Sequence, residues 1–414
     1  MMRPSGILVL ITGVLCQLPW QKALAGSPHI PQPWRAEAVV QGRDEAYDAE
    51  RFLHELTFAH QAEAPSAVEN GIRGTGGSVS SDELYYDFRF RQDFGFREGR
   101  NGFLLDIQRS EDLDGAYDRQ LVGFRQNLGE RSELWLQGDV FSDKAQSDVY
   151  FSGRHYLNGR KGSNETSWLH ASWIIPDAYF NDKTSTPDRF TREPQSLFLQ
   201  WHQQTELRQS TTISINWSPE SEFVSRQENL TVASDNVRAA FDHRQQSGPW
   251  ALSIAIEGER SRRQYQLQGP QEGQRRDFSR DYLKVTTSAR LNEHRLKPRF
   301  GLAYIHLDER GFFGRAIDDT GDIRRREPVV FADITLQASA ATTLSPALYL
   351  GAPDIRQSFD ATREDNHSGF MGKLALPLQF RLSATDRASL TLNPTFYLHK
   401  AAFGGGNLQF HWPM

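Results

Sequence analysis

The sequence is dominated by strict alternation of apolar and polar residues, which begins near Glu83 and continues to the last residue. At the start of this region Leu84, Tyr86 and Phe88 recur at every second position. At the end of the chain, apolar residues at 408, 410, 412 and 414 alternate with Asn, Gln, His and Pro. Successive side chains of a strand point to opposite faces, so this pattern predicts strands with one apolar and one polar face.

The number and length of the alternating segments favour a transmembrane β-barrel over a soluble sandwich. About seventeen segments follow residue 83, each close to the nine to eleven residues that cross a bilayer at a tilt. Hydrophobic residues make up 38% of the chain and the mean hydropathy is −0.60, which is poor for a large buried core. A barrel that turns half of its side chains to water tolerates this composition. Beyond the N-terminal segment, no apolar stretch approaches the roughly 18 residues of a transmembrane helix.

The first 25 residues have the three parts of a secretory signal peptide. Arg3 supplies the positive charge, residues 7–15 form a short apolar stretch, and Ala-Leu-Ala at 23–25 fits the cleavage site. The single cysteine, Cys16, lies in this segment, which excludes disulfides and thiol chemistry from the remainder. We therefore expect a signal peptide (1–25), an N-terminal periplasmic linker and candidate plug (26–47), and a transmembrane β-barrel (48–414).

The charge balance argues against a nucleic-acid partner. The chain has 47 basic and 52 acidic residues, a net charge of −5, and removal of Arg3 and Lys22 with the signal peptide makes the remainder more acidic. Proteins that bind nucleic acids carry an excess of positive charge. An acidic surface is instead suited to water and, through divalent ions, to other anionic groups.

The connections between the segments alternate between long and short from about residue 176 onward. This sorting is typical of external loops and periplasmic turns in outer-membrane barrels. The long connections are predicted at 176–194, 219–234, 261–279, 309–327 and 352–368. The short connections are predicted at 204–208, 245–248, 292–296, 339–342 and 383–388.

Counting strands backward from the C-terminus reveals that one strand is missing. If both ends of the barrel face the periplasm, the last strand descends toward the periplasm, and so does the strand at 83–94. An ascending strand must then precede residue 83, and we place it in residues 48–60. The fold class is therefore predicted as all-β, an antiparallel up-and-down barrel of about 18 strands, with 16 as the alternative count.

Five tryptophans fall on the apolar faces of segments near their ends. Trp201, Trp250 and Trp412 lie near proposed periplasmic ends, and Trp173 and Trp217 lie near proposed external ends. Aromatic side chains gather at the two interfaces of a membrane, so these residues are predicted to form two aromatic girdles. The alternative is that they are core tryptophans of a soluble β-protein.

With these features, the chain resembles a bacterial outer-membrane β-barrel. Leu408, Phe410 and Trp412 are similar to the terminal strand that such proteins present to the barrel-assembly machinery, although Met414 replaces the usual final Phe or Trp. The resemblance covers roughly residues 83–414 and concerns architecture, because no motif assigns a subfamily. It implies outer-membrane lipid and the assembly machinery as partners, and the cell outer membrane as the location. Porins and barrels that accompany polysaccharide secretion or surface assembly are the functional analogies.

The polar face of the segments predicts a lumen wall of mixed charge with a slight cationic bias. At 16 or 18 strands a barrel is wide enough for an aqueous channel unless a segment plugs it. Candidate plugs are residues 26–82 and the connection 309–327, which contains three consecutive arginines at 324–326. The predicted lumen-lining residues are Asp87, Arg89, Arg91, Asp106, Asp139, Arg154, Glu257, Lys284, Arg290, Asp333, Lys373 and Arg381.

No catalytic, metal or cofactor site is predicted. The sequence Asn366-His367-Ser368-Gly369 superficially suggests a Ser/His hydrolase, but adjacent residues of a strand point to opposite faces. The acidic turns around Asp112 and Asp322 could offer carboxylates to Ca²⁺, although solvated loop tips are the simpler interpretation.

The hypothesis with most support is therefore a pore or export conduit for a hydrophilic solute or polymer, with secreted polysaccharide as the best single guess. Polysaccharide or periplasmic export components are the corresponding partners. The alternative is a closed structural barrel that binds glycan through its external loops. An outer-membrane lipid hydrolase is a distant third.

Overall fold

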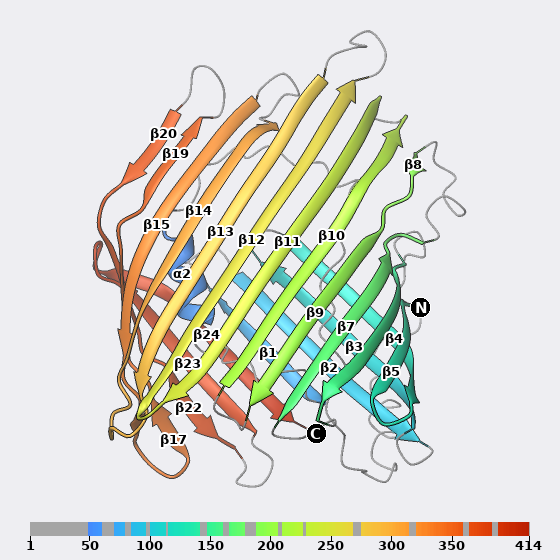
Figure 1. The fold of residues 1–414 in the computed structure, drawn as a ribbon. Helices are drawn as coiled ribbons and strands as arrows, with labels where there is room; N and C mark the ends of the chain where they lie inside the picture. The colour runs from blue at the N-terminus through green and yellow to red at the C-terminus, as the bar shows by residue number, and fades with distance from the viewer. Residues whose placement is uncertain are drawn as a thin grey trace, which may run out of the picture.

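The chain forms one closed antiparallel β-sheet, which confirms the expected fold class (Figure 1). The computed structural model describes residues 49–59, 70–78, 84–96, 100–112, 115–140, 147–159, 165–178, 188–205, 209–226, 229–267, 275–313, 320–358, 364–382 and 388–413. The signal peptide and linker expected at 1–47 lie outside these residues. In the part of the chain that is described, no helix has the length and apolar character needed to span a membrane.

The described residues form one helix and 24 strand segments. The elements are α2 (Arg51–Ala59), β1 (Gly71–Ser78), β2 (Leu84–Phe96), β3 (Asn101–Asp112), β4 (Gly115–Leu128), β5 (Ser132–Asp139), β6 (Val149–Asn158), β7 (Thr166–Ile175), β8 (Arg189–Arg192), β9 (Ser196–Thr205), β10 (Gln209–Ser225), β11 (Leu230–Ser247), β12 (Trp250–Leu267), β13 (Arg275–Leu291), β14 (Arg299–Phe313), β15 (Thr320–Asp333), β16 (Leu336–Gln337), β17 (Thr342–Leu344), β18 (Ala347–Gly351), β19 (Asp354–Ser358), β20 (Glu364–Ser368), β21 (Met371–Ala375), β22 (Leu378–Arg381), β23 (Ser389–Tyr397) and β24 (Ala402–Pro413).

These segments make 18 passes of the wall because four passes are interrupted. The first consists of β8 and β9, the second of β15 and β16, the third of β17 to β19, and the fourth of β20 to β22. Pro346, Pro353 and Pro377 lie at these breaks, where a residue without an N–H group cannot continue the ladder. The wall is therefore regular from β9 to β15 and kinked from β17 to β22.

The missing strand exists, but the placement of it in residues 48–60 is wrong. Residues 51–59 form α2, whose Phe52, Leu53 and Leu56 occupy one helical face. The additional strand is β1, which pairs with both β2 and β24 and closes the barrel. The sequence of β1, Gly-Ile-Arg-Gly-Thr-Gly-Gly-Ser, reads as a loop because glycine is depleted in strands.

Glycine at position 77 is required by the close approach of β1 to its neighbours. A Cβ atom here would overlap the carbonyl oxygen of Gly406 and would lie 2.9 Å from Cβ of Asn407. At the adjacent Gly76 the nearest atom to such a Cβ would be 4.0 Å away. The pairing of β1 with β2 and β24, which closes the barrel and which we call the seam, is therefore tightly packed on the face of Gly77 and open on the face of Gly76.

We expect Gly77→Ala to destabilise the barrel by about 1–3 kcal/mol, because the added methyl group forces the closing strands apart. The neighbouring Gly76→Ala is the matched control and should change stability by less than about 0.5 kcal/mol. The temperature at which the folded band disappears on a gel run without boiling measures both variants. Equal unfolding temperatures would contradict this account of the seam.

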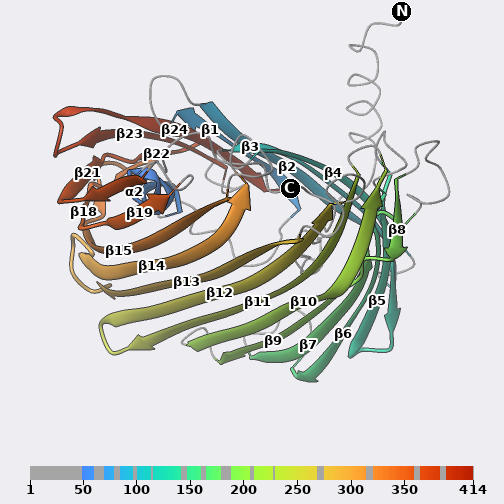
Figure 2. The ribbon, with the colours of Figure 1, turned by 90° about the horizontal axis from the view of Figure 1, so that it is seen from above.

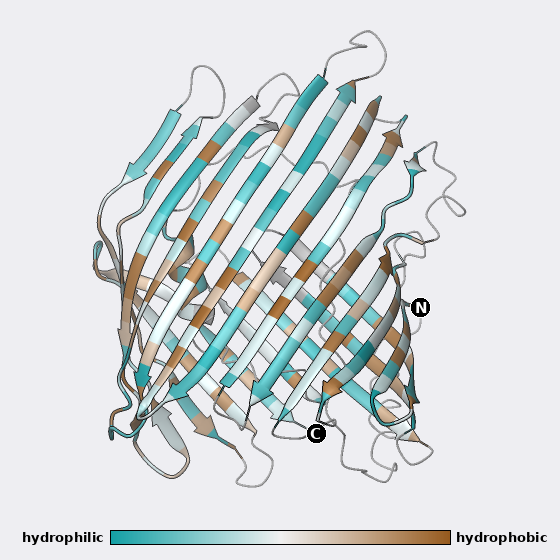
Figure 3. Ribbon diagram, in the orientation of Figure 1, coloured by the Kyte–Doolittle hydropathy of each residue, from teal (hydrophilic) through white to brown (hydrophobic). Residues whose placement is uncertain are grey.

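The predicted long loops are in large part strand, which corrects the expected loop boundaries. Strands β10 and β11 extend through 219–225 and 230–234, and strands β12 and β13 extend through 261–267 and 275–279. Residues 257–263 of β12 are polar on both faces apart from Gly258, so hydropathy gave no strand signal there. The hydrogen-bonded ladders of β12 with β11 and β13 nevertheless continue through these residues, and the wall extends beyond the part of the barrel that is rich in apolar residues (Figure 3).

The exposed large hydrophobic side chains lie on one face of the sheet. Residues directly opposite each other in an antiparallel ladder share a face, so the register carries the assignment from strand to strand around the barrel. Phe103, Phe124 and Leu136 form one such outward row, and Leu199 and Ile215 form another. This apolar outer surface meets the lipid, and the opposite face lines the lumen.

Candidate functional site

The register places all twelve residues predicted to line the lumen on the face opposite the exposed hydrophobics. Arg89 and Arg91 share this face with Gln108 and Asp106 on β3, and Glu257 shares it with Lys284 on β13. The complete set is Asp87, Arg89, Arg91, Asp106, Asp139, Arg154, Glu257, Lys284, Arg290, Asp333, Lys373 and Arg381. Their part in the passage of solutes stays a prediction.

These twelve residues differ widely in accessibility. Five of them, Arg91, Asp106, Arg154, Asp333 and Lys373, are buried beneath neighbouring side chains. The side chains of Arg89 and Lys284 are about one-fifth exposed, at 20% and 21%. Glu257 and Arg381 are exposed. A residue on the lumen face is therefore not automatically in contact with the solution inside the barrel.

An ion-pair network explains the burial on the β2–β6 side of the wall. Asp106 accepts hydrogen bonds from Arg89, at 2.7 Å between Nη2 and Oδ2, and from Arg91, at 3.2 Å. Next to them Arg125 donates from Nε to Oδ2 of Asp93 at 3.1 Å. Opposite charges thus compensate Arg91, Asp106 and Arg125, as burial in a low-dielectric environment requires.

The lumen face of β13 has a different character, because its charged residues are all cations. Arg276, Arg280, Lys284 and Arg290 occupy this face, and we call them the cation row. Carboxylates of other elements lie near the row: Glu309 lies 3.4 Å from Arg280, Glu55 of α2 lies 4.0 Å from Lys284, and Glu257 of β12 is opposite Lys284 in the ladder. All four cations are partly exposed. The row therefore offers positive charge along the length of one strand.

Helix α2 lies inside the barrel against the kinked part of the wall (Figure 2). Phe52, Leu53 and Leu56 belong to the same buried cluster as Tyr349 of β18 and Met371 of β21. When the helix docks, its apolar face and the apolar part of the wall are both removed from water, which favours docking. Part of the region 26–82, which was a candidate plug, thus occupies the lumen.

His54 is the polar centre of this contact. The Nζ atom of Lys373 donates a hydrogen bond to Nδ1 of His54, and Nε2 of His54 donates to the hydroxyl of Tyr397. His54, Lys373 and Tyr397 are all buried. Burial, followed by the nearby charges of Lys373 and Lys400, lowers the pKa of His54 to about 2. The imidazole is therefore neutral when the helix is docked.

Glu50, which immediately precedes α2, ties the start of the helix to the wall. One of its oxygens lies 3.0 Å from Nε2 of His399, and the other accepts a hydrogen bond from Lys400 at 2.8 Å. Burial opposes ionisation of this carboxyl, but hydrogen bonds from Lys400, Tyr397 and His399 outweigh it and lower its pKa. Glu50 and His54 thus fasten one turn of chain to β21, β23 and the following turn.

This docking contact is what the sequence reasoning missed. The spacing of Phe52 and Leu56, four residues apart with His54 and Glu55 between them, is a helical signal, yet it competes with a strand interpretation in so short a segment. Lys373 was predicted as a lumen residue without any indication that a histidine more than 300 positions earlier binds it. Only the closed fold brings these residues together.

The five predicted girdle tryptophans all lie on the outward face by register. Trp173 and Trp217 flank Leu197 in one row, and Trp250 and Trp412 lie at the ends of β12 and β24. Trp201 lies beside Leu169 and Ile213 and is partly buried. The outward positions fit interfacial residues, and the assignment of each to one interface stays a prediction.

His367 and Ser368 do not form a nucleophile pair. They are successive residues of β20, where His367 faces Ile355 in the ladder and Ser368 faces Asp354, so their side chains leave opposite faces of the sheet. Within the described ranges, no group of three or more His, Cys, Asp or Glu residues is arranged to hold a metal ion. Part of each acidic turn, including Asp114 and Asp318, lies outside those ranges.

Comparison with known proteins finds similarity only in solved structures, since no family model and no curated protein matches. The chain is similar to OccAB1 of Acinetobacter baumannii (11% identity, 86% of this chain and 99% of that one, TM-score 0.44). It is also similar to a BenF-like porin of Pseudomonas fluorescens (13%, 83% and 98%, 0.42) and to OccK2 of Pseudomonas aeruginosa in complex with glucuronate (15%, 83% and 96%, 0.40).

The geometry itself defines the type of barrel. The sheet is closed, its outer face carries exposed apolar side chains around the circumference, and its inner face is polar and charged. Closed barrels of this construction are the β-proteins of outer membranes. The chain is an outer-membrane β-barrel.

Proposed function

We propose that this barrel is a pore for small hydrophilic solutes and that it favours anions. The observation that carries the proposal is the cation row on the lumen face of β13. Eighteen-stranded barrels are wide enough for an aqueous channel, and cationic side chains along such a channel lower the electrostatic barrier to anions. Helix α2 occupies part of the lumen beside this row, with Glu55 near Lys284.

The size of the cargo follows from the same helix. With α2 docked, the cross-section is reduced, which favours small solutes over a polymer. Polysaccharide export remains a narrower hypothesis that requires α2 to leave the lumen first. A closed structural barrel is the competing function, and an electrical measurement separates it from a pore.

Planar bilayers containing the purified full chain provide the test. We expect stable open steps and a reversal potential in a KCl gradient that shows preference for Cl⁻ over K⁺. Arg280→Gln should reduce the anion-to-cation permeability ratio about twofold, because one charge acts on the passing ion at roughly 8 Å through water. A barrel that inserts and stays silent would overturn the proposal.

Arg275→Gln is the matched control for this substitution. Arg275 lies on the same strand and loses the same charge, but it points outward, where its Nε atom lies 2.9 Å from Oδ1 of Asp277. We expect its permeability ratio to equal that of the unmodified protein. If both variants shift the ratio equally, surface charge rather than the cation row sets the selectivity.

A further inference from the structure

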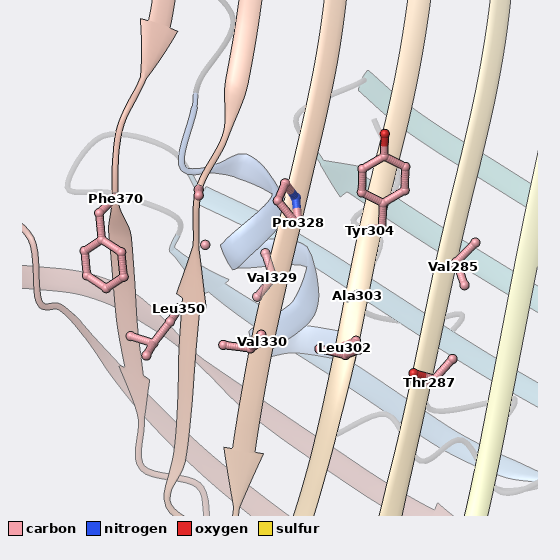
Figure 4. A pocket seen from close by; sticks show the side chains of 12 residues that line it. Val285, Thr287, Leu302, Ala303, Tyr304, Pro328, Val329, Val330, Leu350 and Phe370 are labelled. Atoms are coloured by element: carbon pink, nitrogen blue, oxygen red, sulfur yellow. The ribbon is translucent and has the colours of Figure 1, made fainter.

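The outward face of the kinked wall has an apolar groove in the region that faces lipid. Its volume is about 580 Å³, and it is lined by residues that include Leu302, Tyr304, Pro328, Val330, Leu350 and Phe370 (Figure 4). Phe370, Leu302 and Val330 are 63%, 59% and 50% exposed, so the groove opens to the surroundings of the barrel. Figure 4 shows α2 behind the same panel, on the lumen side.

The groove exists because the wall is interrupted at this height. Pro328 contributes no N–H group, and its carbonyl oxygen accepts a hydrogen bond from Ala352 at the break between β18 and β19. On the next pass, Gly369 and Phe370 separate β20 from β21. Fewer side chains project outward at such breaks, which leaves a depression that a flexible apolar chain can fill.

A group of cations lies directly beyond one end of the groove. On the outward face of β15, Pro328 and Val330 line the groove, and Arg326 and Arg324 are the next two outward residues toward the upper end in Figure 1. The register places Arg326 beside His306 and Asp354, and Arg324 beside Asp308 and Arg356. Successive outward residues are about 7 Å apart. The polar and apolar parts are thus close enough for one amphiphilic molecule.

The ion pairs in this group leave positive charge available. Arg356 lies 3.3 Å from Asp354, and Arg324 approaches Asp308 at 3.9 Å, while Asp308 is already bonded to Arg310. Within the described part of the chain, Arg326 has no carboxylate at ion-pair distance. The three arginines at 324–326 therefore do not form a plug: Arg325 points inward and is buried, and the other two face out.

We propose that this surface binds a phosphorylated, multiply acylated lipid of the outer leaflet, of the lipid A type. An acyl chain fills the groove between Leu302 and Phe370, and phosphate groups bind Arg324 and Arg326. Arginine binds phosphate through charge-assisted hydrogen bonds, and the order of groove and cations matches the order of chain and headgroup in the leaflet. This role is independent of conduction, since a silent barrel could have it too.

Native mass spectrometry of the purified full chain in detergent tests this site with hexa-acylated bisphosphoryl lipid A as the probe. We expect the double variant Arg324→Gln/Arg326→Gln to weaken binding at least about tenfold. The control Arg260→Gln/Arg262→Gln removes two outward arginines with the same spacing from β12, away from the groove, and should change binding less than twofold. Equal losses in the two variants would overturn the proposal.

Two further experiments test the acyl chains and the phosphate groups of the ligand separately. Val330→Trp should fill the groove and weaken binding without changing charge, whereas Val237→Trp, another outward valine, should not. Dephosphorylated lipid A should bind the unmodified protein at least about tenfold more weakly than the bisphosphoryl form. If phosphatidylglycerol binds as tightly as lipid A, the site is one for acidic lipids in general and the proposal fails.

Discussion

Deletion of residues 49–59 is expected to raise the single-channel conductance about twofold, because a helix with side chains is about 10 Å wide and leaves the lumen. The helix packs on β18 and β21 through Phe52, Leu53 and Leu56 and is not part of the wall. The barrel should therefore still close through β1 and β24. Conductance in planar bilayers, with the folded fraction checked on an unboiled gel, measures the effect.

Glu55→Gln is the appropriate control for the deletion. Glu55 lies 3.3 Å from Arg51 and 4.0 Å from Lys284, and it does not belong to the apolar face of α2. This variant should keep the helix docked and the conductance unchanged. If the deletion leaves conductance unchanged in a folded, inserted barrel, α2 does not limit passage.

Acidification from pH 7 to pH 5 is expected to weaken the docking of α2 and thereby to raise the mean conductance. The pKa of His54 is about 2 in the docked helix, against an ordinary value of 6.5. Between these values the undocked helix binds a proton and the docked helix does not, so falling pH favours undocking. The docking constant falls about tenfold per pH unit below 6.5, or about thirtyfold at pH 5.

The other charged groups around His54 support the same direction. The positive charges of Lys373 and Lys400 oppose a charged imidazole. Docking lowers the pKa of Glu50, so the stabilisation of the docked helix by Glu50 is present above the ordinary pKa of 4.5. It is lost only as pH falls through the lowered pKa of the docked state. Of His54 and Glu50, it is therefore His54 whose shifted pKa makes docking depend on pH between 7 and 5.

Two variants isolate the effect of His54. His54→Gln keeps a polar side chain but cannot gain a proton, so its conductance should not respond to pH between 7 and 5. The pair Leu53→Cys/Gly351→Cys should lock the helix when oxidised, because a Cβ at position 351 would lie 3.7 Å from Cδ2 of Leu53. The oxidised form should lose the acid response and regain it on reduction. An acid response that persists in His54→Gln would contradict this mechanism.

The parts of the fold that depend on one strand at a time were predictable from the sequence. The alternation of side chains between the two faces is a local property of a strand. The assignment of Arg89, Glu257 and Lys284 to the lumen face therefore followed from their positions relative to the apolar residues of the same strand. The count of about 18 passes followed from some seventeen alternating segments and from strand direction, which required one strand more. The fold class and the general position of the wall needed no information about contacts between distant residues.

The parts that depend on distant residues were not predictable. Glycine in β1 is favoured by the approach of β24, which lies more than 300 residues away in the sequence. The helical state of residues 51–59 is stabilised by a wall formed by β15 to β21. Residues 257–263 of β12 are strand because the ladder continues, although they carry almost no apolar side chains on either face. In each case tertiary contacts override local preference.

The position of α2 constrains the order in which the protein can be assembled. The helix precedes β1, yet it packs on strands near the other end of the chain, and β1 pairs with the final strand, Gly71 opposite Pro413. Closure must therefore wait until the whole chain has been synthesised. A helix enclosed by the finished cylinder has to be in place before the seam shuts or be threaded in afterwards. If it is placed first, α2 acts as an internal template on which the last strands gather, and the earliest folded segment shapes the wall that is made last.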